Sequence, residues 1–379
     1  MFLNRTFART LAFTLTLAAL AGGSLPLARA GQQTQPPPQQ QPPAEQRPKP
    51  RDDAPAAAPT VDDDEVVTVD TSLTNVPFSA IDRDKRFFTT LSKGDIRVLE
   101  DGVPQEIFTF QQQVDLPLTL AIVIDTSRSQ EYTLPQEKAA ARTFVDEVLR
   151  PSKDEVAVVS FTGEVTLEQG LTGNVARVRK AIESVDYVPP SGYIGGGVVV
   201  GTPPISGDNQ SLSQSTSLWD AVWVTCDEVL AESSERTRRA VILLTDGFDT
   251  SSQKKLQEAV DRAIKMETLV FAVGIGDRFN HQGVDEGSLR KITERTGGRA
   301  YFPKNEEDMR VAFAQIQREL REQYLVAYSP TNKQRDGSFR KLQIEVVNPD
   351  LKKNSLKLTY RQGYFARSGA PGQPRRRRG

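Results

Sequence analysis

Three side chains with hard oxygen donors follow an unbroken apolar run in the first half of the sequence. The run, residues 118–124, ends at Asp125, and Ser127 and Ser129 follow at alternate positions. A run of this length without a polar interruption is typical of a strand that is buried on both faces. Oxygen donors at the carboxyl end of such a strand suit a small hard cation such as Mg²⁺, and open α/β sheets bind their ligands at that edge. Asp and Ser are also ordinary turn and helix-capping residues, so this motif alone leaves both interpretations open.

Two later residues complete a candidate ligand set. Thr216 lies at the start of an expected helix, and Asp246 ends the apolar run 241–245. If the two apolar runs form adjacent parallel strands, Asp125 and Asp246 emerge at the same edge of the sheet. Two carboxylates and three hydroxyls favour Mg²⁺, Mn²⁺ or Ca²⁺ over zinc. Because Mg²⁺ needs about six donors and two carboxylates only balance its charge, water or the carboxylate of a partner protein can complete the site.

Strands and helices alternate between residues 116 and 323. This order predicts an α/β fold with a Rossmann-like, doubly wound, mostly parallel sheet that helices cover on both faces. The expected strands are 118–125, 155–161, 240–245, 269–275 and about 299–302. The expected helices are 137–149, 175–185, 218–230, 254–264, 287–295 and 306–320.

The segments 61–115 and 324–366 on either side are rich in β-forming residues. Asp101-Gly102 between 96–99 and 106–110 is a hairpin signal. Each segment alone is too small to bury a core, so we expect the two to pair as an accessory β module.

The ends of the chain indicate export. Residues 1–30 resemble a secretory signal peptide, with Arg5 and Arg9, an apolar stretch at 11–21 and the cleavage pattern Ala28-Arg29-Ala30. The apolar stretch is short for a membrane span, although an uncleaved anchor remains the alternative. We therefore expect a periplasmic, extracellular or cell-surface protein. Residues 31–60 read as a disordered Pro/Gln-rich linker, and 367–379 as a disordered basic tail.

Composition excludes several classes of protein. A net charge of −1 gives no indication of nucleic-acid binding. Cys226 is the only cysteine, which excludes an intramolecular disulfide and a cysteine-based metal site. His281 is the only histidine, which argues against a histidine-dependent hydrolase.

Other candidate motifs in the sequence are weaker. Gly274-Ile275-Gly276 lacks the third glycine of a dinucleotide loop. Trp219 and Trp223, one helical turn apart, are expected in the core, as is Cys226.

The segment 188–214 carries six glycines and four prolines and is longer than ordinary connections, so it is either functional or disordered. It leads directly into Ser215-Thr216, which places it beside the candidate ligands. We expect it to border the site as an insertion loop.

The motifs together resemble a known family. D-T-S-R-S at Asp125, S-T-S-L-W-D-A at Ser215 and L-L-T-D-G at Leu243 occur in the order found in a von Willebrand factor A domain, over residues 116–323. The flanking S-K-G-D-I at Ser92 and G-Y-F at Gly363 are similar to a bacterial exported subgroup described from Acidobacteria. The resemblance implies a metal-ion-dependent adhesion site (MIDAS), with some ligands acting through water. Its implied ligands are Asp125, Ser127, Ser129, Thr216 and Asp246. Arg128, and Gln214-Ser215, stand where the family often has glycines.

These observations predict an exported, non-enzymatic protein that binds an acidic residue of a partner protein through Mg²⁺, or Mn²⁺ or Ca²⁺, in adhesion or envelope assembly. No nucleic-acid partner and no stable membrane span after signal cleavage are expected. One alternative is a metal-assisted hydrolase, which would need a general base near the metal. The other is a structural envelope protein with a degenerate metal site.

Overall fold

The computed structural model describes residues 73–84, 86–113, 116–187, 215–234, 237–276, 283–353 and 355–369, together with the backbone of 193–194 and 197–198. The predicted signal peptide, linker and basic tail lie outside these residues, except for 367–369. So do His281 and most of the Gly-rich segment 188–214. Within the described part of the chain, no helix combines the length and the apolar character needed to cross a bilayer.

A six-stranded sheet lies at the centre of residues 116–323. Its strand order is β12-β11-β10-β5-β6-β7, and all neighbours are parallel except β6 and β7. The strands are β5 (Leu118–Asp125), β6 (Glu155–Phe161), β7 (Val165–Thr172), β10 (Arg238–Thr245), β11 (Thr268–Gly274) and β12 (Ala300–Tyr301). The α/β fold class predicted from the sequence is therefore confirmed.

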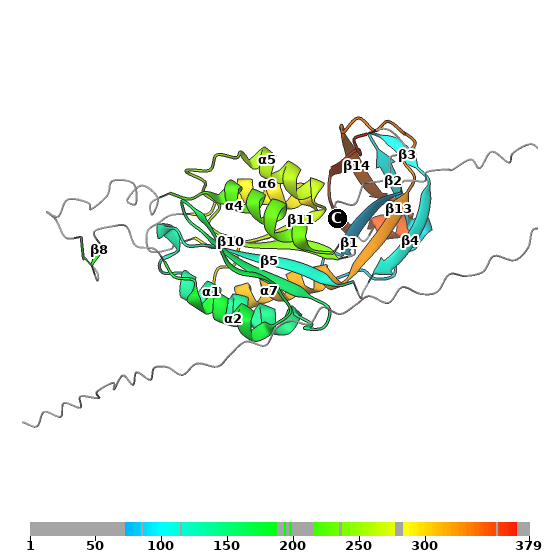
Figure 1. The fold of residues 1–379 in the computed structure, drawn as a ribbon. Coiled ribbons are helices and arrows are strands. Elements are labelled where there is room, and N and C mark those ends of the chain that lie inside the picture. Colours follow the sequence, from blue (N-terminus) through cyan, green and yellow to red (C-terminus); the bar gives the residue numbers. More distant parts are fainter. Residues whose placement is uncertain are drawn as a thin grey trace, which may run out of the picture. The chain divides into compact units, whose positions relative to one another are not determined.

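Helices cover both faces of this sheet (Figure 1). One face packs against α1 (Leu134–Val148), α2 (Val175–Ser184) and α7 (Glu306–Arg321). The other packs against α4 (Leu218–Val224), α5 (Leu256–Lys265) and α6 (Glu286–Thr296). Alternate residues of β5 face the two layers: Leu120 and Ile122 face α1, while Ala121 and Val123 face α4. This explains the unbroken apolar run, since a strand buried on both faces has no solvent side.

Two parts of this domain differ from the sequence-based expectation. Strand β7 was not predicted, because it is only partly buried and its apolar residues (Val165, Leu167 and Leu171) do not form a continuous apolar run. The helix predicted at 218–230 is present but changes type along its length: α4 ends at Val224, and a π-helical turn (Thr225–Val229) and a short 3₁₀ turn (Leu230–Glu232) follow directly. Trp219 and Cys226 are buried as predicted, whereas Trp223 is half-buried and lies beneath the cationic ends of Lys254 and Arg262.

Strands from both ends of the described chain form two further sheets around one apolar core. The first has the order β15-β1-β13-β4 and the second β16-β14-β2-β3. We refer to them as the β module. Its strands are β1 (Thr74–Ile81), β2 (Ile96–Glu100), β3 (Val103–Gln105), β4 (Ile107–Gln113), β13 (Gln323–Tyr328), β14 (Phe339–Val346), β15 (Lys357–Tyr360) and β16 (Gly363–Phe365). A short helix, α8 (Pro349–Lys353), precedes β15.

The predicted hairpin partner across Asp101-Gly102 was wrong. Both turn residues have positive φ, 49° and 83°, which is typical of a two-residue hairpin turn. Such a turn starts the return strand at once, so β2 pairs with β3 and not with residues 106–110. Those residues belong to β4, which pairs with β13 in the other sheet.

Candidate metal centre

Asp125 ends β5 in a position where its carboxylate is held on both sides. The side chain is fully buried. The backbone N–H of Ser127 donates to Oδ1 at 2.9 Å, and the Thr245 hydroxyl at the end of β10 donates to Oδ2 at 2.6 Å. Because β5 and β10 are adjacent parallel strands, the two strand ends orient this carboxylate together.

Ser127 and Ser129 lie in the turn that follows. Their hydroxyl oxygens are 3.0 Å apart, brought together by a single 3₁₀ turn at Arg128–Gln130. Ser127 is buried and Ser129 half-buried, whereas the Arg128 side chain is exposed. The alternate spacing read from the sequence thus turns two hydroxyls to one side and the arginine to solvent.

Asp246 follows β10 and carries an unsatisfied oxygen. Its Oδ1 accepts a hydrogen bond from the backbone N–H of Phe248 at 3.1 Å, while its Oδ2 is buried and has no hydrogen-bond partner among the residues that the structure describes. Burial raises the pKa of Asp246, against the opposing effect of the Ser129 hydroxyl. Burial, and then the charge of Asp246, raises the pKa of Asp125 to about 7. Two buried carboxylates that repel each other, one with a free oxygen, fit a site for a divalent cation.

Thr216 is buried and fixed to the loop that follows Asp246. Its backbone N–H donates to Thr250 Oγ1 at 2.8 Å, and its carbonyl accepts from the Thr250 N–H at 2.9 Å. The Asp249 carboxylate accepts the Leu218 N–H at 2.9 Å, which caps the start of α4. One loop therefore carries Asp246 and anchors Thr216. Among the described residues, no hydrogen bond joins the Thr216 hydroxyl to the other four candidate ligands.

Sequence reasoning missed Glu137, a fully buried glutamate in the first turn of α1. Neither of its carboxylate oxygens has a hydrogen-bond partner among the described residues. Burial raises the pKa of Glu137 to about 8; the Thr133 hydroxyl opposes this, and the charges of Asp125 and Asp246 add to it. The sequence did contain a sign of this burial. Glu137 lies three residues before Ala140, and residues with this spacing share a helix face, so Glu137 lies on the apolar face of the helix.

Three further residues that support the site were also missed. They are Gln130, Thr245 and Asp249, and each acts on a ligand-bearing loop through a hydrogen bond. The buried Gln130 amide donates to the Ile275 carbonyl at 3.3 Å and so ties the serine turn to the end of β11. Within the described residues, no three His, Cys, Asp or Glu side chains lie together in a way that could hold a metal ion. The candidate centre therefore has two carboxylates and relies on hydroxyls for its other donors.

Comparisons with known protein families match the region that contains the candidate ligands. Two family models described as von Willebrand factor type A domain match residues 120–248 and 205–318, and so include all five candidate ligands. The chain contains a von Willebrand factor type A (VWA) domain. All strands of the β module lie outside the matched residues. A search among curated proteins found no match.

Solved structures are similar to this chain at low sequence identity, and three of them show this. Proximal thread matrix protein 1 from the mussel byssus has 17% identity and a TM-score of 0.44, over 59% of this chain and 51% of its own. A VWA protein from Catenulispora acidiphila has 13% identity and a TM-score of 0.42, over 70% of this chain and 75% of its own. An aerotolerance-related membrane protein from Bacteroides fragilis has 16% identity and a TM-score of 0.39, over 54% of this chain and 98% of its own. This chain thus spans about half the length of the mussel protein.

Proposed function

We propose that this VWA protein binds a divalent cation through Asp125, Ser127, Ser129, Thr216 and Asp246 and uses it to hold an acidic residue of a partner protein. In this proposal the protein is exported and non-enzymatic, and it acts in adhesion or in assembly of the cell envelope. The observation that carries the proposal is the buried Asp246 Oδ2, which has no hydrogen-bond partner within the described part of the chain. Leaving such an oxygen unsatisfied costs stability. A cation that this oxygen coordinates therefore adds to the stability of the fold.

The residues around Asp246 have separable roles in this proposal. Asp125 already receives hydrogen bonds from Ser127 N–H and Thr245, so its orientation is fixed before a cation arrives. The paired hydroxyls of Ser127 and Ser129 offer two neutral oxygens that face each other. When bound, the cation supplies positive charge and an open coordination position that a partner's carboxylate can fill. A site with only two carboxylates leaves no net negative charge to repel that carboxylate.

Isothermal titration with metal alone tests the first half of the proposal. We expect Mn²⁺ or Mg²⁺ to bind wild-type protein at one site, and Asp246→Asn to weaken that binding at least about tenfold. Asp350→Asn removes an exposed charge on α8 and should bind metal like the wild type. Zn²⁺ belongs in the same series, because proximal thread matrix protein 1 has been solved with zinc in its MIDAS motif. Equal affinity of Asp246→Asn and wild type would contradict the proposal.

Retention of envelope proteins on the immobilised chain tests the second half. The proposal requires a protein that is retained with Mg²⁺, released by chelator and not retained by Asp246→Asn. Binding that survives both chelator and Asp246→Asn would support a structural role without metal. Metal-dependent turnover of phosphate esters or peptides would support a hydrolase instead.

A further inference from the structure

A cavity of about 530 Å³ is formed by residues that the candidate metal centre does not use. Its walls come from the 329–338 connection between β13 and β14, from β14 and β16, and from the C-terminal end of α5. This volume lies within the range of pockets that hold small organic ligands.

The cavity has a strong excess of positive charge. One carboxylate, that of Glu267, is among the lining residues. Six lining side chains are cationic: Lys265, Lys333, Arg335, Arg340, Arg361 and Arg367. The chain as a whole has 48 Lys and Arg against 49 Asp and Glu, so its composition does not account for this excess.

Two of the six cations are used by the protein itself. Arg340 is buried and pairs with the buried Glu100 at 3.2 Å, and the Tyr364 hydroxyl donates to the same carboxylate at 2.8 Å. Arg361 is also buried and pairs with Glu267 at 3.1 Å. These two pairs fix the wall of the cavity and leave four cations.

Three of those four present their charge without a carboxylate partner. Lys265, Lys333 and Arg367 are exposed, and none forms an ion pair with any residue that the structure describes. The Lys265 ammonium lies 4.6 Å from the centre of the Phe365 ring, and Lys333 donates to Ser329 Oγ at 2.7 Å. Like charges gathered in one concave site raise its affinity for anions of several charges.

The connection that carries Lys333 and Arg335 is held in place. Arg340 donates to the carbonyl of Asn332 at 2.6 Å and also to that of Gln334. The Thr331 N–H donates to Gln105 at 2.9 Å, and the Ala366 N–H to Ser338 at 2.8 Å. The backbone that carries these two cations is therefore fixed before any ligand binds, which lowers the entropy cost of binding.

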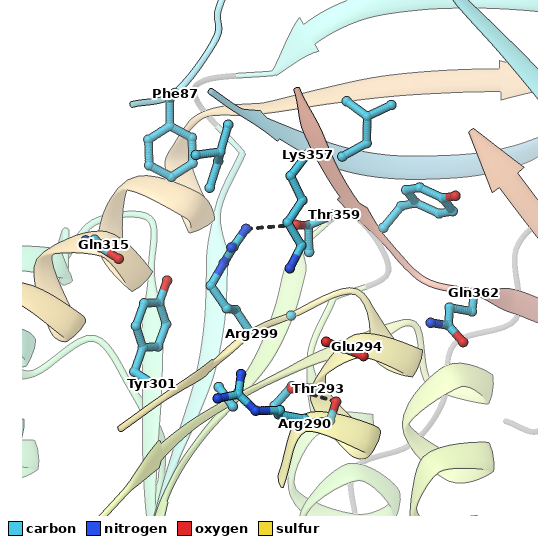
Figure 2. A pocket seen from close by; sticks show the side chains of 15 residues that line it. Phe87, Arg290, Thr293, Glu294, Arg299, Tyr301, Gln315, Lys357, Thr359 and Gln362 are labelled. Atoms are coloured by element: carbon cyan, nitrogen blue, oxygen red, sulfur yellow. Dashed lines mark hydrogen bonds between the residues drawn. The ribbon is translucent and has the colours of Figure 1, made fainter. Parts of the chain in front are cut away.

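A second cavity, of about 480 Å³, shows the contrast (Figure 2). Its cations are engaged by the protein: Arg299 donates to Thr359 at 2.8 Å and pairs with the buried Glu319, and Arg290 pairs with Glu286 at 2.8 Å. Glu294 also lines this cavity and offsets Lys357. Its charges are balanced, so it does not favour an anion.

We propose that the 530 Å³ cavity is a binding site for a small molecule with two or more phosphate groups, contacted by Lys265, Lys333 and Arg367. Guanidinium groups bind phosphate oxygens in pairs, and lysine ammonium groups add compact charge. A single carboxylate would satisfy one of these cations, whereas an oligophosphate reaches several.

Isothermal titration with inorganic tripolyphosphate at 50 mM NaCl, with chelator present throughout, tests this assignment. We expect saturable binding of one tripolyphosphate by the full chain. The double variant Lys333→Glu with Arg367→Glu should bind at least about tenfold more weakly. Lys352→Glu with Lys353→Glu on the exposed α8 changes the net charge equally and should stay within about twofold of wild type. Circular dichroism of both variants shows whether they remain folded.

Several results would overturn the proposal. Equal losses in the two double variants would mean that net charge alone attracts the anion. Tighter binding of citrate or of an acidic peptide than of tripolyphosphate would exclude a phosphate site. Absence of saturable binding by wild type would exclude the site altogether. Asp246→Asn must bind tripolyphosphate like wild type, because the cavity shares no residue with the metal centre.

Discussion

Replacing Glu137 by Gln should stabilise the metal-free protein, by an amount that depends on pH. Gln has nearly the shape of a protonated Glu but cannot ionise. The pKa of Glu137 is about 8 in the folded protein against 4.5 ordinarily, so the folded state holds a proton that the unfolded state releases. Folding therefore becomes less favourable as pH rises from 4.5 to 8, by about 1.4 kcal/mol per pH unit. Glu137→Gln removes this cost.

The expected gain at pH 7 follows directly. At pH 7, which is 2.5 units above the ordinary pKa of 4.5, the free energy of unfolding of Glu137→Gln should exceed that of wild type by about 3 kcal/mol. The gap between variant and wild type should nearly vanish at pH 4, widen steadily to pH 8 and then stay constant. Urea unfolding at intervals from pH 4 to 9, with chelator present, measures it.

A matched control lies on the same helix. The Glu147 side chain is exposed, so Glu147→Gln should change the free energy of unfolding by less than about 0.5 kcal/mol at every pH. A Glu137→Gln effect that does not vary with pH, or that destabilises the protein at pH 7, would mean that burial does not keep Glu137 protonated.

Two further predictions concern the strands that position the site. Hydrogen bonds from two arginines, including Arg321, outweigh burial and lower the pKa of Asp154 to about 2. Asp154→Asn should therefore cost about 2.5 kcal/mol at pH 7, and urea unfolding should show this gap shrinking as pH falls from 4 towards 2. A Cβ on Gly298 would lie 2.0 Å from the Val270 carbonyl oxygen, so Gly298→Ala should lower the unfolding free energy by at least about 2 kcal/mol. Gly287→Ala, which meets only an ordinary contact, is its control in thermal unfolding and should change little.

The sequence predicts the central sheet well because burial leaves a direct pattern. Strands β5 and β10 are apolar over residues 120–124 and 240–244 and end in Asp125 and Thr245-Asp246, so both the strands and their polar ends are visible in the sequence. Strand β7 leaves no such pattern, because Leu167 and its neighbours are half-buried or exposed at the sheet edge. Hydrophobic periodicity reports burial, and an edge strand has little.

The support of the candidate site depends on contacts between distant residues. Asp249 caps α4 from a loop 31 residues away, and Thr245 reaches Asp125 across 120 residues. Neither partnership follows from local spacing. Glu137 differs, since its position on the apolar face of α1 was readable, but an acidic residue in a first helical turn is also favoured by the helix dipole. The sequence therefore allows Glu137 to be either a buried residue or an exposed one that favours the helix dipole. Its burial in the folded protein decides between the two.

Anomalous diffraction from crystals grown with Mn²⁺ locates the cation itself. We expect one strong peak within coordination distance of Asp246 Oδ2, with the Ser127 and Ser129 hydroxyls among its neighbours, and no such peak in Asp246→Asn crystals. A peak elsewhere on the protein, or none near Asp246, would contradict the proposed metal site.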